Sequence, residues 1–147
     1  MALYAFDGTW NQSKTTEDPK LEDTNVVRFF RAYAKNTPPG TNFYVPGVGT
    51  RFDNIGRILG GVFGLGELPR IKEGYDFLCR RWLANDKEIN IVGFSRGAAT
   101  TLDFCHYIQA NGIKHPDTGE VLEHDPEINF LGVWDTVAAF GLGNLGN

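Results

Sequence analysis

The chain has 147 residues, 41% of them hydrophobic and 13% aromatic, which suits one globular domain with a packed core and excludes a disordered chain. Fourteen basic against 18 acidic residues give a formal net charge of -4, so nucleic acid is excluded as the principal partner. The N-terminus lacks the pattern of a secretory signal, and no apolar run approaches the roughly 20 residues that span a bilayer. We therefore expect a protein that is cytoplasmic when it is made.

Four short apolar runs predict strands buried on both faces of a sheet. They are Leu3–Phe6, Asn42–Val45, Glu88–Phe94 and Ile128–Trp134. Helical periodicity predicts a helix from Thr24 or Asp23 to Ala34, a second from Pro69 to about Asn85, and a third from Ser95 to Asn111. Residues 114–127 are polar and rich in turn-forming residues, so we expect a surface loop there.

The alternation of strands and helices predicts an α/β fold, with a parallel sheet of about four strands and helices on both faces. We find no internal repeat or boundary, so residues 1–147 are expected to form a single domain. In such sheets, ligands bind beyond the carboxyl ends of the strands, where the strand order reverses.

The segment Gly93-Phe94-Ser95-Arg96-Gly97 follows the third predicted strand and opens an alanine-rich helix. This is the G-x-S-x-G pattern of a nucleophile elbow, in which a serine lies on a strained turn between strand and helix. Gly93 and Gly97 are needed because a Cβ at either position would collide with a neighbouring element. The sequence therefore predicts a serine hydrolase with Ser95 as the nucleophile.

Residues at two other strand ends could complete the site. The backbone N–H of Arg96 is predicted to stabilise an oxyanion, with a second donor from Gly8 or Thr9. Asp7 either supports this loop or simply caps an ordinary Asp-Gly turn. Asp135 is the candidate acid that orients a histidine, and the alternative is a capping aspartate after a strand.

The histidine of the expected triad is the difficulty. His106 falls within a predicted helix, and His115 and His124 fall in the polar excursion before Asp135, in the wrong order for this class. No histidine follows Asp135. We therefore expect either an N-terminal part of a longer hydrolase, with the histidine beyond Asn147, or a non-catalytic fragment or binding module on the hydrolase scaffold.

Five motifs in chain order resemble a known family. They are Phe6-Asp7-Gly8-Thr9-Trp10-Asn11, Asp23-Thr24-Asn25-Val26, Tyr44-Val45-Pro46-Gly47-Val48-Gly49-Thr50, Gly93-Phe94-Ser95-Arg96-Gly97-Ala98 and Gly132-Val133-Trp134-Asp135-Thr136-Val137. Together they resemble the α/β-hydrolase domain of bacterial type VI secretion phospholipase effectors and their uncharacterised relatives. The resemblance covers nearly the whole chain.

The resemblance implies a three-layer α/β-hydrolase-like fold and a lipolytic serine esterase of phospholipase A type with a Ser-Asp-His triad. Ser95 falls on the nucleophile and Asp135 on the acid, whereas the family's histidine belongs to a later His-x-Asp-x-Gly-Gly motif. It further implies an ester or phospholipid substrate, contact with a membrane surface, a secretion or immunity partner and delivery to other cells. No cofactor or metal is expected, since Cys79 and Cys105 lack metal-binding spacing and are interpreted as free thiols.

Two weaker patterns are similar to motifs of other functional classes, and one glycine-rich segment has two possible structures. The start of the first motif is similar to that of haloacid-dehalogenase-type phosphatases, but Ala5 stands where their nucleophilic aspartate would be. Gly141–Gly146 matches G-x-G-x-x-G formally and opens no helix. The glycine-rich segment Gly56–Gly66 is expected to be a closely packed helix or an apolar flap, in which Val62 and Phe63 would line an acyl-chain site.

Overall fold

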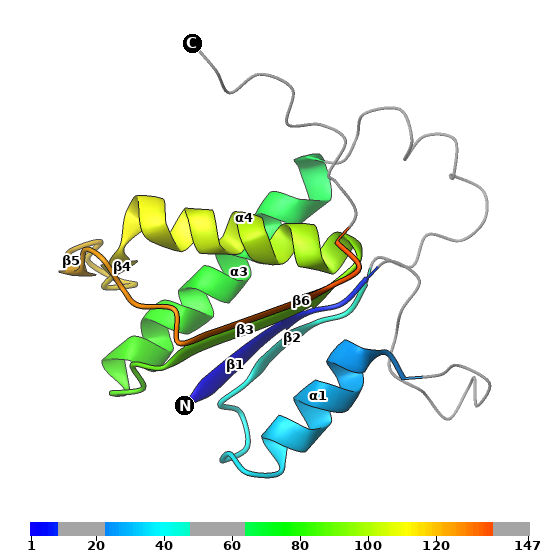
Figure 1. The fold of residues 1–147 in the computed structure, drawn as a ribbon. Helices are drawn as coiled ribbons and strands as arrows, with labels where there is room; N and C mark the ends of the chain where they lie inside the picture. Colours follow the sequence, from blue (N-terminus) through cyan, green and yellow to red (C-terminus); the bar gives the residue numbers. More distant parts are fainter. Residues whose placement is uncertain (9–22, 48–63, 137–147) are drawn as a thin grey trace.

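The computed structural model describes residues 1–8, 23–47 and 64–136. Its centre is a four-stranded parallel sheet in the order β2-β1-β3-β6 (Figure 1). The strands are β1 (Ala2–Phe6), β2 (Phe43–Val45), β3 (Ile89–Phe94) and β6 (Phe130–Trp134). All four lie within the predicted runs except for Ala2, which extends β1 by one residue. The predicted parallel sheet is confirmed.

Helices cover both faces of the sheet, which confirms the predicted three-layer α/β architecture (Figure 1). α1 (Asn25–Ala34) lies on one face, and α3 (Gly64–Leu83) and α4 (Arg96–Asn111) lie on the other. Successive side chains of a strand point to opposite faces, so each strand contributes to two cores. The core on the α3/α4 side includes Tyr4, Phe6, Ile91 and Phe104, and the smaller core under α1 includes Leu3, Ala5, Val26 and Val92.

The start of α1 follows the predicted capping chemistry. Thr24 has extended backbone angles, and its Oγ1 accepts a hydrogen bond from the N–H of Val27 at 3.1 Å. This is the N-cap arrangement that satisfies one of the N–H groups lacking a partner within the helix. Of the two candidate caps, the structure selects Thr24.

One prediction about local structure is wrong, and one short element was not predicted. Pro69 does not begin a helix, because α3 already starts at Gly64 and contains Pro69. Pro69 is the sixth residue of this helix, where a proline removes one backbone hydrogen bond and its ring crowds the carbonyl group four positions earlier. The predicted surface excursion at residues 114–127 is exposed or partly exposed, but a short antiparallel hairpin of β4 (Ile113–Lys114) and β5 (Val121–Glu123) was not predicted there. Its strands are too short for a periodic sequence signal.

The strand order reverses between β1 and β3. From β1 the chain passes through α1 to β2 on one side, and it then returns through α3 to β3 on the other side of β1. α1 and α4 consequently leave neighbouring strands toward opposite faces of the sheet (Figure 1). Asp7 and Ser95, which directly follow these two strands, therefore flank the switch point where α/β proteins bind ligands.

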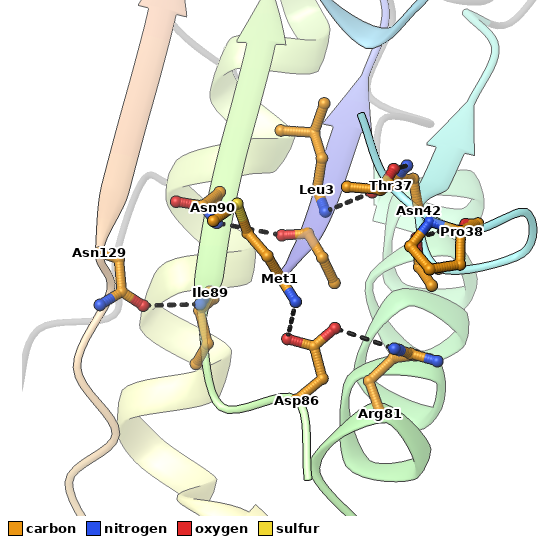
Figure 2. Close-up of polar contacts among 12 residues, drawn as sticks. Met1, Leu3, Thr37, Pro38, Asn42, Arg81, Asp86, Ile89, Asn90 and Asn129 are labelled. Atoms are coloured by element: carbon orange, nitrogen blue, oxygen red, sulfur yellow. Dashed lines mark hydrogen bonds and ion pairs between the residues drawn. The ribbon is translucent and has the colours of Figure 1, made fainter. Parts of the chain in front are cut away.

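Side-chain amides fix the opposite edge of the sheet, where the strands begin (Figure 2). The Oδ1 of Asn42 accepts a hydrogen bond from Leu3 N at 3.0 Å, and that of Asn129 accepts one from Ile89 N at 2.7 Å. Asn90 donates from Nδ2 to the carbonyl oxygen of Ala2 at 3.3 Å. These bonds satisfy backbone groups at the strand starts. We call this region the amino edge and the opposite one the carboxyl edge.

A buried aspartate adds charge to the amino edge. Asp86, 5% exposed at its side chain, contacts the amino group of Met1 at 2.5 Å and Nη2 of Arg81 at 2.9 Å (Figure 2). Burial alone would raise the pKa of Asp86, but its two cationic partners outweigh burial and hold the pKa below its usual value. The aspartate is therefore a paired, ionised group.

Some predictions concern residues outside the described ranges. These are the oxyanion role of Thr9, the acyl-chain site at Val62 and Phe63, most of the glycine-rich segment, and Gly141–Gly146. Within the described ranges, no helix combines the length and apolar character needed to cross a membrane.

Candidate active site

Ser95 occupies a strained turn between β3 and α4. Its backbone angles are φ 54° and ψ -120°. Residues other than glycine rarely adopt this combination, which costs about 1–3 kcal/mol. The serine is half-buried, and its side chain makes no capping hydrogen bond to the helix that follows. Its hydroxyl is thus presented at the carboxyl edge rather than used to cap α4.

The two glycines of the motif are required by close contacts. A Cβ on Gly93 would lie 2.2 Å from Oγ1 of Thr101 and 2.6 Å from the carbonyl oxygen of Gly97. A Cβ on Gly97 would lie 2.3 Å from the carbonyl oxygen of Phe6. All three distances are far below van der Waals contact, so only glycine fits at the two positions. The steric reason predicted for both glycines is confirmed.

Backbone hydrogen bonds hold the strained turn in place. The N–H of Ser95 donates to the carbonyl oxygen of Trp134 at 2.9 Å, which extends the β3–β6 ladder by one bond. The carbonyl oxygen of Ser95 accepts from the N–H of Ala98 at 3.0 Å. The serine is therefore tied to a neighbouring strand on one side and to its own helix on the other.

Arg96 is the first residue of α4. The backbone N–H groups at a helix start point outward and carry the positive end of the helix dipole, which favours an anion there. Burial lowers the pKa of the Arg96 guanidinium. The position of Arg96 suits the predicted oxyanion donor, and the role itself stays a prediction.

Asp135 directly follows β6 at the same edge as Ser95. Phe94 is the register partner of Trp134, so Ser95 and Asp135 are the next residues on neighbouring parallel strands. Asp135 is exposed and, like Ser95, has a positive φ, here 47°. The topology thus brings the candidate nucleophile and the candidate acid to one edge, while the catalytic roles of Ser95 and Asp135 stay predictions.

Asp7 is the most enclosed polar residue of the carboxyl edge, with 4% of its surface exposed. Its Oδ1 accepts a hydrogen bond from Gly8 N at 2.8 Å, and its Oδ2 accepts from Oγ1 of Thr24 and from the hydroxyl of Tyr44, both at 2.8 Å. Burial raises the pKa of Asp7 above its usual value, and the three donors only partly offset that effect. The sequence prediction missed Thr24 and Tyr44 as its partners, although both lie in motifs that carry the family resemblance.

The bond to Asp7 bears on the predicted second oxyanion donor. Because the N–H of Gly8 donates to Asp7, it would have to leave this carboxylate before it could donate to an oxyanion. Thr9, the other predicted donor, is outside the described residues. The assignment of both therefore stays a prediction.

All three histidines of the chain lie away from Ser95. The helix α4 has 16 residues and starts beside Ser95, so its far end is about 24 Å away at about 1.5 Å per residue. His115 and His124 lie beyond that end, in and beside the β4–β5 hairpin (Figure 1). His106 is exposed and lies three turns along α4. None of them can serve as the base of Ser95 in this structure.

The described residues contain no group of three or more histidine, cysteine, aspartate or glutamate side chains placed to hold a metal ion. Cys79 and Cys105 are free thiols, as predicted, and burial raises the pKa of both. At the carboxyl edge lie the half-buried Ser95, the exposed carboxylate of Asp135 after the neighbouring strand, and the buried carboxylate of Asp7.

Comparison with known protein families identifies a family to which the chain is similar. The model of the family described as "T6SS, Phospholipase effector Tle1-like, catalytic domain" matches residues 3–124. This segment runs from β1 to the hairpin and includes Ser95, and it ends before Asp135. No curated protein and no solved structure shows a significant match to the chain.

Proposed function

This chain belongs to the family of Tle1-like type VI secretion phospholipase effectors, as their catalytic domain, and we propose that it hydrolyses carboxylic esters of lipids with Ser95 as the nucleophile. The observation that carries the proposal is the backbone of Ser95. A serine at φ 54° costs free energy, and its hydroxyl does not recover that cost by capping α4. Strain of this kind, at the switch point of an α/β sheet, is expected where it exposes a nucleophile.

In the proposed reaction, Oγ of Ser95 attacks the ester carbonyl carbon while a base removes its proton. The carbonyl oxygen becomes an oxyanion near the N–H of Arg96 and a donor from the Gly8–Thr9 loop. Collapse of this intermediate expels the alcohol, which takes the proton from the base, and leaves an acyl-serine. Water then attacks the acyl group in the same manner and releases the fatty acid.

The base of this reaction is the part that the described residues do not supply. Asp135 would orient an imidazole and stabilise its charged form. Since His106, His115 and His124 lie far from Ser95, the proposal requires a histidine outside the printed sequence. Reading the natural coding sequence beyond Asn147 for such a residue is a direct check.

The family name supports phospholipid as the substrate class and delivery to other cells as the route. We propose that a phospholipid ester at a membrane surface is the substrate, with phospholipase A-type cleavage. A secretion or immunity protein is the corresponding partner. The acidic net charge of -4 gives no reason to add nucleic acid to these partners.

The test is ester hydrolysis by the natural full-length protein beside its Ser95→Ala variant. Nitrophenyl esters of short and long acyl chains report esterase activity, and phosphatidylcholine vesicles report release of fatty acid. We expect Ser95→Ala to lower kcat at least about 1,000-fold. Activity that survives the substitution would refute Ser95 as the nucleophile.

A second function, a non-catalytic binding module on the hydrolase scaffold, is favoured by the distance of all three histidines from Ser95. A fluorophosphonate probe separates the two, because it labels a serine that has both an elbow geometry and a base. Labelling of the full-length protein at Ser95 supports the enzyme. A protein that neither hydrolyses esters nor labels supports the binding module.

A further inference from the structure

We propose that Asp7 is a positioning residue for the active site, which holds the end of β1 against the nucleophile elbow by collecting hydrogen bonds from three separate segments of the chain. The inference rests on the proposed function, since it concerns the geometry in which Ser95 reacts. Asp7 does not touch the reacting atoms in this role.

Three donors converge on the Asp7 carboxylate from different elements. Gly8 belongs to the loop after β1, Thr24 caps α1, and Tyr44 lies in β2. The backbone N–H of Asp7 adds a fourth bond, to the carbonyl oxygen of Val45 at 3.0 Å. One residue thereby links the end of β1 to both α1 and β2.

The donors are suited to an ionised carboxylate. Burial and the neighbouring Asp7 raise the pKa of Tyr44, so its hydroxyl stays protonated and remains a donor at physiological pH. The first turn of α1 contains no acidic residue of its own. Asp7, bound to the cap residue Thr24, brings a negative charge to the positive end of that helix.

The Asp7 network reaches the elbow through backbone contact. The carbonyl oxygens of Phe6 and Asp7 would lie 2.3 Å and 2.6 Å from a Cβ on Gly97, which means that the first turn of α4 packs directly on the end of β1. Close-packed backbone transmits a displacement instead of absorbing it. A shift of Asp7 would therefore change the separation between the Gly8 loop and Ser95.

The described residues show no cation beside Asp7, which distinguishes it from the paired Asp86 at the amino edge. A buried carboxylate held by neutral donors alone lowers the stability of the folded state, because burial disfavours the ionised form. Its position at the switch point, one residue beyond β1, points to a role in placing the loop. That role predicts an effect on turnover that exceeds the effect on folding.

The experiment compares two pairs of variants in the natural full-length protein, each assayed well below its melting temperature. Asp7→Asn and Tyr44→Phe alter the network at the carboxyl edge. Asp86→Asn and Tyr33→Phe are matched controls, because Asp86 is also a buried aspartate and the Tyr33 hydroxyl accepts a hydrogen bond from Asn90 at the amino edge. Rates are measured with a soluble nitrophenyl ester, and folding is measured by thermal unfolding.

We expect Asp7→Asn to lower kcat about 100-fold and Tyr44→Phe about 10-fold, with KM changed less than about threefold, because the reacting groups are misplaced while binding remains. Both controls should keep kcat within about twofold, even where the melting temperature falls. Tyr44→Phe keeps the ring and loses one donor, so it tests the network even if Asp7→Asn fails to fold.

Two results overturn the inference. One is a folded Asp7→Asn or Tyr44→Phe variant with unchanged kcat, and the other is an equal loss of kcat in the carboxyl-edge variants and the controls. Failure of the proposed function looks different, because the unmodified protein would then lack ester hydrolysis and Ser95 labelling altogether.

Discussion

The two edges of the sheet each contain a buried aspartate, in opposite surroundings. At the amino edge, Asp86 is paired with two cations, and asparagine side chains satisfy the strand starts. At the carboxyl edge, Asp7 has neutral donors, and both Ser95 and Asp135 have positive φ. The positive φ of Asn85, after the end of α3, is of a kind that asparagine tolerates. The amino edge is built for stability, and the carboxyl edge keeps strain where the chemistry is proposed.

The largest expected effect is a substitution at the junction of β1 and α4. Gly97→Ala places a Cβ 2.3 Å from the carbonyl oxygen of Phe6, so the free energy of unfolding should fall by about 3 kcal/mol. Urea unfolding measures this. Gly74→Ala is the matched control, since its Cβ would meet side-chain atoms alone, the nearest from Phe43 at 3.2 Å, and alanine favours the helix. Equal destabilisation of both would mean that the junction is not tightly packed.

Next in size is the ion pair at the amino edge. Asp86→Asn should lower the free energy of unfolding by about 2 kcal/mol at pH 7, because it leaves Arg81 and the Met1 amino group without their anion. The lowered pKa of Asp86 means that its contribution is present above the unfolded pKa of about 3.9 and is lost as pH falls through the lower folded value. The difference between variant and parent should therefore vanish in acid. A difference that persists at low pH would contradict this.

A single amide contact at the same edge should matter less. Asn42→Ala removes the bond that its Oδ1 accepts from Leu3 N and should cost about 1 kcal/mol, with kcat unchanged. Chemical denaturation together with the nitrophenyl ester assay checks both parts. A loss of kcat in a folded Asn42→Ala variant would show that the edges are coupled.

The smallest expected effect on stability is at Asp7. Its pKa is raised in the folded protein, so its contribution to stability is present below about pH 3.9 and declines as pH rises through the folded value. Asp7→Asn should remove this decline and stay within about 1 kcal/mol of the parent at pH 7. The free energy of unfolding, measured for variant and parent from about pH 3 to about pH 7, gives the slope against pH. A steeper decline in the variant would reverse the sign argued for Asp7.

The sequence predicted the parts of the site that depend on local pattern. The apolar run before Gly93, the two glycines and the helix after Ser95 follow from sterics within a few residues, and the structure has them as predicted. The place of Asp135 at the end of a neighbouring strand followed from the strand order along the chain.

What the sequence did not predict depends on contacts between distant segments. The bonds from Thr24 and Tyr44 to Asp7 join residues 17 and 37 positions apart, and no local pattern encodes them. The β4–β5 hairpin was missed because its strands are too short for a period to be visible. The same holds for Asn42 and Asn129, whose role appears only when strand starts are side by side.

The position of β1 has a consequence for the order of folding. β1 precedes β2 and β3 in the chain and lies between them, with Ala2 in register with Ile89. Strands that are far apart in the sequence pair late in folding, because the chain loses the entropy of closing a long loop before it gains the contacts between the strands. The nascent chain must therefore carry an unprotected apolar strand until β3 has left the ribosome. Because Gly97 packs on Phe6, the turn at Ser95 cannot close earlier, so it forms only together with the finished core.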